Sequence, residues 1–132
     1  MVFEPSGVSD ESLFKEMLAL THVLKHSHER LPELGISADA PLIIETMGRG
    51  GLRYRSRLAG AKSKSWVRCE PYQLNRFVDT GGAGDWCTAG IVHVLGRHGA
   101  KAFNQIGISK LQSAISFGQA IAAWNCGFLG AR

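Results

Sequence analysis

The feature that most constrains the fold is a run of small residues at positions 78–85, VDTGGAGD. An apolar, strand-like segment precedes it, and the residues that follow, Trp86 to about Arg97, have the apolar spacing of a helix. Small residues at such a junction let the backbone approach a ligand closely. Because the first amide groups of a helix have no partner inside it, we expect Gly82, Ala83 and Gly84 to offer an anion site, most simply for phosphate.

Asp85 lies in the first turn of that predicted helix. A bound phosphate repels a neighbouring carboxylate, so the pair makes chemical sense if Asp85 takes a proton from a hydroxyl that attacks the phosphate. The alternative is that Asp85 only caps the helix N-terminus. Spacing alone leaves both interpretations open, because Gly-rich turns are common.

The rest of the chain predicts an α/β domain with a mainly parallel sheet, because strands alternate with helices. A content of 45% apolar and 20% charged residues excludes disordered and collagen-like classes. We expect strands at 2–3, 22–25 and 41–46, a hairpin of 52–58 with 66–72, and helices from Ser9 to about 20, at 29–34, at 86–97 and from Ser109 to about 124. Because the chain begins in a strand and ends without a closing element, we expect part of a larger domain, or a sheet edge that associates with another chain.

The charge is uneven along the chain. Residues 49–68 carry seven basic residues and no acidic one, whereas residues 1–48 carry eight acidic and three basic residues. A basic surface that meets nucleotide phosphate accounts for this pattern, and a solvated hairpin is the simple alternative. A nucleic-acid partner is the weaker interpretation, because only Tyr54 and Trp66 interleave the basic residues.

Several other features carry less information about function. The first ten residues lack the basic and apolar segments of a signal peptide, and the three cysteines have no metal-ligand spacing, so we expect a cytoplasmic protein with reduced thiols. Residues 111–131 carry no charge before Arg132 but are too polar for a confident membrane span, so a buried helix is favoured. His22, His26 and His28 lie where a strand runs into a turn, which does not favour a metal site.

The run Asp79-Thr80-Gly81-Gly82-Ala83-Gly84-Asp85 resembles the D-T-x-G-A-G-D signature of the ribokinase-like carbohydrate kinases, the PfkB family, at every fixed position. Residues 46–51, TMGRGG, resemble the family's T-x-G-x-x-G beside the nucleotide. Residues 117–123 resemble the helix beside the adenine, where the family often has Asn or His in place of Gln119, and Gly130-Ala131 matches a late Gly-Ala. The resemblance covers residues 1–132 as the C-terminal, nucleotide-binding part of such a kinase, without its N-terminal sugar-binding and lid part.

The resemblance implies a partial ribokinase-like three-layer domain that transfers the γ-phosphoryl group of ATP to a hydroxyl of a sugar or nucleoside. It implies that Asp85 is the base, that Gly82, Ala83 and Gly84 form the anion hole, and that Mg²⁺ arrives with ATP. The implied nucleotide-binding residues are Thr46, Gly48, Gly51 and Gln119, and a monovalent cation such as K⁺ would lie near Asp79.

This chain departs from the family's N-x-x-E motif, because Ser27 stands in place of Asn and Arg30 in place of Glu. The metal ligands are therefore unknown from the sequence, and the sugar cannot be named. An alternative function is a nucleotide-binding module that binds ATP or ADP and transfers nothing.

Overall fold

The computed structural model describes residues 1–29, 39–74 and 76–130. It divides into two compact units, the first formed by Met1–Leu58 and Lys62–Glu70, the second by Ala59–Ala61 and Pro71–Arg132. The first unit holds Thr46, Gly48 and Gly51, and the second holds the run 79–85 and Gln119. The helix predicted at 29–34 lies almost wholly outside the described residues.

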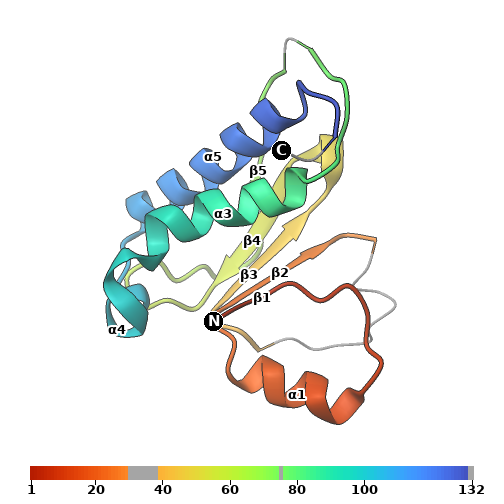
Figure 1. Ribbon diagram of the computed structural model, residues 1–132. Helices are drawn as coiled ribbons and strands as arrows, with labels where there is room; N and C mark the ends of the chain where they lie inside the picture. Colours follow the sequence, from red (N-terminus) through yellow and green to blue (C-terminus); the bar gives the residue numbers. More distant parts are fainter. Residues whose placement is uncertain (30–38, 75, 131–132) are drawn as a thin grey trace. The chain divides into compact units, whose positions relative to one another are not determined.

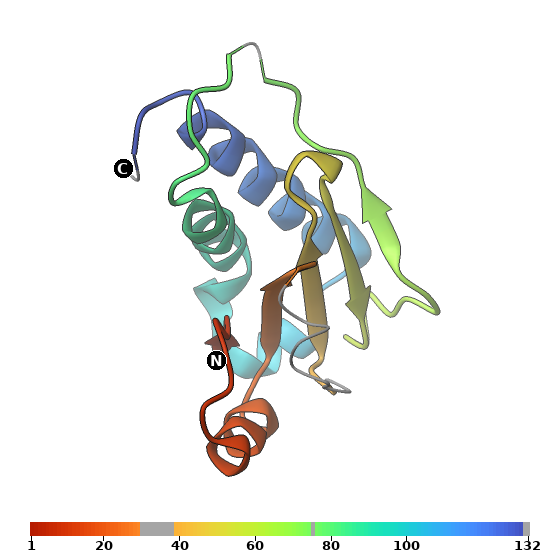
Figure 2. The ribbon, with the colours of Figure 1, turned by 90° about the vertical axis from the view of Figure 1, so that its right-hand side faces the viewer.

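The first unit is built on a five-stranded sheet with the order β1-β2-β3-β4-β5 (Figure 1). The strands are β1 (Val2–Phe3), β2 (Val23–Ser27), β3 (Leu42–Thr46), β4 (Leu52–Ser56) and β5 (Val67–Cys69). β1, β2 and β3 are parallel, whereas β4 is antiparallel to β3 and β5 is antiparallel to β4. The predicted α/β class and the hairpin are confirmed, although both hairpin strands are shorter than expected, and β5 forms one edge of the sheet (Figure 2).

Among the described residues of the first unit, the α-helix is α1 (Glu11–Ala19). Its N-cap is Asp10, whose carboxylate accepts from the Leu13 amide at 3.0 Å, and not the predicted Ser9. An Asp one residue further along can bond the amide three positions ahead, which is the geometry that an N-cap needs. Phe14 of α1 packs against Phe3 with ring centroids 5.3 Å apart, and the core continues through Leu24, Ala40, Ile43, Leu18 and Trp66.

The second unit is helical: α3 (Ala83–Leu95), the short η2 (Gly96–His98), α4 (Gly99–Asn104) and α5 (Ile108–Asn125). α3 and α5 lie side by side (Figures 1 and 2). Two glycines allow this close approach. A Cβ added to Gly90 would lie 2.8 Å from the Gly118 Cα, and one added to Gly118 would lie 2.7 Å from the Cys87 carbonyl oxygen. Both helices carry buried side chains, namely Cys87, Ile91 and Leu95 on α3 and Leu111, Ala114 and Ile115 on α5.

The predicted helix bounds in the second unit need correction. α3 begins at Ala83 and not at Trp86, because Gly82 can adopt the left-handed conformation that starts the helix there. α5 begins after Gly107 as N-cap and not after Ser109, and α4 was not predicted at all. The segment 99–104 is only six residues long, too short to show a helical period in the sequence.

Within residues 1–29, 39–74 and 76–130, no helix combines the length and the apolar character that a membrane span requires.

Candidate functional site

The start of α3 presents backbone amides. Its N-cap, Gly82, has φ 74° and makes no side-chain cap, and the first helical bond runs from the Trp86 amide to the Gly82 carbonyl at 3.0 Å. The amides of Gly84 and Asp85 precede that bond, so the helix gives them no acceptor. The Ala83 amide, in contrast, donates to the Thr80 carbonyl at 3.1 Å. The positive end of the helix dipole and these amides suit an anion.

Asp85 stands in the first turn of α3 and is exposed. It is not the N-cap, because Gly82 occupies that position. The capping role that the sequence left open for Asp85 is therefore wrong, although a carboxylate in the first turn still interacts favourably with the helix dipole. The same position also leaves the carboxylate accessible to a substrate that reaches the start of the helix.

The turn before α3 is fastened to the segment after α5. The Cys126 carbonyl accepts from the amides of Val78 at 2.8 Å and Asp79 at 3.3 Å, and Asn125 Nδ2 donates to the Gly81 carbonyl at 2.6 Å. Asp79 accepts from the Gly81 amide at 3.1 Å through Oδ1 and from the Gly130 amide at 2.8 Å through Oδ2. These anchors hold the turn in one conformation.

The two amide bonds also set the charge state of Asp79. Hydrogen bonds from the Gly81 amide and then the Gly130 amide stabilise the ionised carboxyl, and they hold the pKa of Asp79 below its usual value. Sequence reasoning chose Asp79 and Gly130 from the motif, but it missed Asn125. The available signal was an Asn at the end of a long helix that carries no charged residue after Lys110, and the structure buries that side chain completely.

Aromatic side chains lie beside this turn in the second unit. Trp86 contacts Trp124 edge-on with ring centroids 5.8 Å apart, and Trp124 contacts Phe128 at 4.9 Å. Trp86 thus packs within the second unit. Gln119 lies on α5 and is half-buried, and Cys87 is buried.

In the first unit, the β3–β4 connection forms a tight glycine turn. Thr46 ends β3, and η1 (Gly48–Gly50) follows. Gly48 and Gly51 have φ values of 53° and 82°, which explains the glycines at these two positions of the motif. The Met47 amide donates to the Gly51 carbonyl at 2.8 Å and closes the turn.

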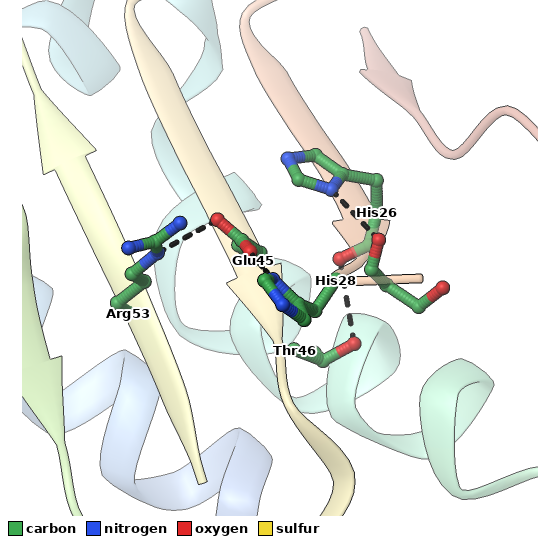
Figure 3. Close-up of polar contacts among 6 residues, drawn as sticks. His26, His28, Glu45, Thr46 and Arg53 are labelled. Atoms are coloured by element: carbon green, nitrogen blue, oxygen red, sulfur yellow. Dashed lines mark hydrogen bonds and ion pairs between the residues drawn. The ribbon is translucent and has the colours of Figure 1, made fainter. Parts of the chain in front are cut away.

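A buried carboxylate next to Thr46 was not predicted. Glu45 is 3% exposed and lies between two basic side chains: Oε1 accepts from His28 Nδ1, and Oε2 accepts from Arg53 Nε at 2.7 Å (Figure 3). Burial by itself raises the pKa of Glu45, but the hydrogen bonds from Arg53 and His28 outweigh it and hold the pKa below its usual value. No sequence motif contains these residues, because the strand register brings them together from β3, β4 and the turn after β2.

The residues of the divergent N-x-x-E region are only partly described. Ser27 ends β2 and pairs in register with Thr46, whereas Arg30 lies outside the described residues. Among the residues that the structure describes, no group of three or more His, Cys, Asp or Glu side chains is arranged to hold a metal ion. The predicted site residues fall into two groups. The turn group, Asp79, Gly82, Ala83, Gly84 and Asp85, lies in the second unit together with Gln119, and the hairpin group, Thr46, Gly48 and Gly51, lies in the first unit.

The sequence matches no protein-family model and no curated protein. Solved structures, in contrast, share its fold. Aminoimidazole riboside kinase from Salmonella enterica, solved with aminoimidazole riboside and an ATP analogue, is 23% identical with a TM-score of 0.76, over 98% of this chain and 46% of that one. Fructokinase from Vibrio cholerae, in its fructose-, ADP- and potassium-bound form, is 21% identical with a TM-score of 0.74, over 98% and 45%.

A nucleoside kinase from Methanocaldococcus jannaschii, described as an archaeal member of the ribokinase family, is 16% identical with a TM-score of 0.73, over 98% of this chain and 42% of that one. The chain thus spans less than half the length of these structures. The predicted resemblance is confirmed for the fold: the chain has the architecture of part of a ribokinase-family kinase.

Proposed function

We propose that residues 1–132 form the C-terminal, nucleotide-binding part of a ribokinase-like kinase, which moves the γ-phosphoryl group of ATP to a hydroxyl of a sugar or nucleoside. One observation carries the proposal. The Gly82-capped start of α3 offers amides beside an exposed carboxylate, Asp85, within a chain that shares the fold of such kinases. The amides attract the phosphate, and the Asp85 carboxylate would act as a base that removes the proton of the attacking hydroxyl.

In the proposed reaction, the acceptor oxygen forms a bond to the γ-phosphorus while the bond from that phosphorus to the bridging oxygen of ADP breaks. Asp85 takes the proton of the attacking hydroxyl. The amides of Gly82, Ala83 and Gly84 face the negative charge of the transferring group, although Ala83 would first have to release its bond to Thr80. Phosphoryl transfer needs positioning and charge stabilisation more than covalent chemistry, so this short set of groups is adequate.

The remaining residues receive roles in binding. We assign Thr46, Gly48 and Gly51 of the hairpin and Gln119 of α5 to the nucleotide. Mg²⁺ would enter with the phosphates of ATP, which commonly supply most of its ligands together with water. An activity that uses MgATP fits the cytoplasm.

Asp79 and Asn125 fit a monovalent cation such as K⁺. Asn125 Oδ1 is buried and has no hydrogen-bond partner among the described residues, while the Nδ2 atom of the same amide bonds the turn at Gly81. Carbonyl and carboxylate oxygens are the ligands that K⁺ takes. We expect KCl to raise the melting temperature of the chain more than choline chloride does, and the Asn125→Leu variant to lose the difference.

A transfer assay tests the function directly. The chain is incubated with MgATP and, in turn, ribose, fructose, inosine and aminoimidazole riboside, and ADP release is compared with and without acceptor. Asp85→Asn should abolish acceptor-dependent release. Asp10→Asn is the matched control, since Asn caps α1 as well as Asp does. Acceptor-dependent release by the parent that is equally fast in Asp85→Asn would contradict the role of Asp85.

The second candidate function, a nucleotide-binding module without transfer, is favoured by Ser27 at the position where the family has Asn. It predicts that the parent binds MgATP or ADP and releases no additional ADP with any acceptor.

A further inference from the structure

The exposed imidazole of His28 is held in place by a buried carboxylate. Glu45 Oε1 accepts from His28 Nδ1, and Oε2 accepts from Arg53 Nε (Figure 3). The side chain of Glu45 is 4% exposed, whereas that of His28 is 62% exposed. Only Nε2 of the His28 ring remains for another partner. That atom accepts a hydrogen bond in the neutral ring and donates one in the imidazolium.

The position of His28 places it beside the hairpin group. Its backbone amide donates to the Thr46 carbonyl at 2.8 Å, and the Thr46 hydroxyl donates to the His26 carbonyl at 3.4 Å. β2 and β3 are parallel, so both bonds lie where the two strands end. In open α/β sheets ligands bind outside the carboxyl ends of the strands, and here the glycine turn of the proposed nucleotide site follows directly.

The charge around Glu45 favours an anion at Nε2. The Arg53 guanidinium offsets the negative charge of Glu45, and residues 49–68 carry seven basic residues and no acidic one. The Arg53 guanidinium also lies 4.7 Å from the centroid of the Trp66 ring, which helps to fix it against Glu45. The hydrogen bond to Glu45 holds the exposed imidazole in one orientation at the strand end, which suits it to contact a ligand.

We propose that His28 contacts a phosphate oxygen of the bound nucleotide through Nε2, and that Glu45 and Arg53 are positioning residues that orient its ring. The inference rests on the proposed function, since it concerns the phosphates of the nucleotide proposed there. His28 would add a phosphate contact next to Ser27, which stands where the family has Asn. The ligand class is a nucleoside di- or triphosphate, and a nucleoside without phosphate does not need this contact.

Calorimetric titration of the full chain with ADP and with adenosine tests the proposal. The variant is His28→Asn, whose carboxamide can still bond Glu45 in place of Nδ1 but has no atom in place of Nε2. The control is His93→Asn, which removes an exposed imidazole from α3. We expect His28→Asn to weaken ADP binding about 10-fold, the effect of one charge-assisted hydrogen bond, and to leave adenosine binding unchanged.

The outcomes separate this inference from the proposed function. If the parent binds ADP and His28→Asn binds it with equal affinity, the role of His28 is wrong and the proposed function is unaffected. Equal losses for ADP and adenosine also overturn it, since they show a general disturbance of the site. A folded parent that does not bind ADP overturns both proposals.

The positioning role of Glu45 needs a readout of the ring itself. In a long-range ¹H–¹⁵N spectrum, ADP should shift the His28 Nε2 resonance of the parent, and the shift should be much smaller in Glu45→Gln while its amide spectrum stays dispersed. An unchanged Nε2 resonance in the parent at saturating ADP would contradict the contact, and an equal shift in Glu45→Gln would contradict the positioning role.

Discussion

In the two units, different chemical groups would make the proposed anion contacts. In the second unit, the turn before α3 uses backbone amides, and the bonds that hold it run from Asn125, Cys126 and Gly130. In the first unit, the strand ends use side chains, with Glu45 as the buried centre of a cluster that includes His28 and Arg53. One arrangement depends on glycine conformations, and the other depends on strand register and charge pairing.

The difference determines which substitutions each region tolerates. A site made of amides loses its geometry when a Cβ or a wide side chain enters the turn, whatever the charge of that side chain. A site made of a buried carboxylate and two bases fails when any one charge is left without its partner. The predictions below test this contrast, from the largest expected effect to the smallest.

Glu45→Ala should produce the largest loss of stability. It removes a buried carboxylate that accepts from both His28 and Arg53, and each hydrogen bond to a charged group contributes about 1.5 kcal/mol or more, so we expect the free energy of unfolding to fall by about 3 kcal/mol. Urea denaturation measures the change. Glu11→Ala is the control, because Glu11 forms an exposed ion pair with Lys15, and loss of that pair should not change the free energy of unfolding measurably. A similar stability for both variants would show that the side-chain cluster is not buried in solution.

Gly118→Ala tests the helix pair that supports the backbone site. The new Cβ would lie 2.7 Å from the Cys87 carbonyl oxygen and 2.8 Å from Ile91 Cγ1, so α3 and α5 must move apart. Overpacking of this kind costs about 2 kcal/mol, which urea denaturation detects. Gly96→Ala is the matched control, since its nearest contact is an ordinary 3.4 Å and its backbone is helical. Equal stability of Gly118→Ala and the parent would contradict the close approach.

Gly82→Ala should have a smaller effect on stability. Gly82 has φ 74°, and the left-handed conformation costs an L-residue about 1 kcal/mol. Both thermal and urea denaturation report this loss. If Gly82→Ala is as stable as the parent, the N-cap of α3 has another conformation in solution.

The pH dependence of the turn should give the smallest effect. The amides of Gly81 and Gly130 lower the folded-state pKa of Asp79, so its ionised form contributes stability above the unfolded-state pKa of about 4. That contribution disappears as the pH falls from there through the lower folded-state pKa. The melting temperature of the parent should therefore fall more steeply below about pH 4 than that of Asp79→Asn. Equal slopes would contradict the two amide bonds.

Backbone features of this chain could be predicted from its sequence, and side-chain contacts between strands could not. The run 79–85 predicts its own turn, because the glycines and the following apolar spacing are local signals. The anchor at Asn125 and the cluster around Glu45 depend on contacts across 44 and 17 residues of sequence. No local pattern encodes such contacts, since register and helix packing decide them.

Helix starts show the same limit on a smaller scale. Ser9 and Ser109 have the residue type that caps helices, yet Asp10 and Gly107 occupy the two caps. Several neighbouring residues satisfy the same local preference, and packing of the helix selects among them. The resemblance to ribokinase-like kinases contributed the fold, while the roles of Asp85, Thr46 and Gln119 remain predictions.

The central claim is that the start of α3 binds the phosphates of a nucleotide through its backbone. Calorimetric titration of the chain with MgATP, beside the variant Gly84→Trp, tests it most directly. Gly84 is exposed in the first turn, so the indole should cover the amides and leave the helix intact. We expect binding by the parent and none by Gly84→Trp. Equal binding by both, or no binding by a folded parent, would contradict the claim.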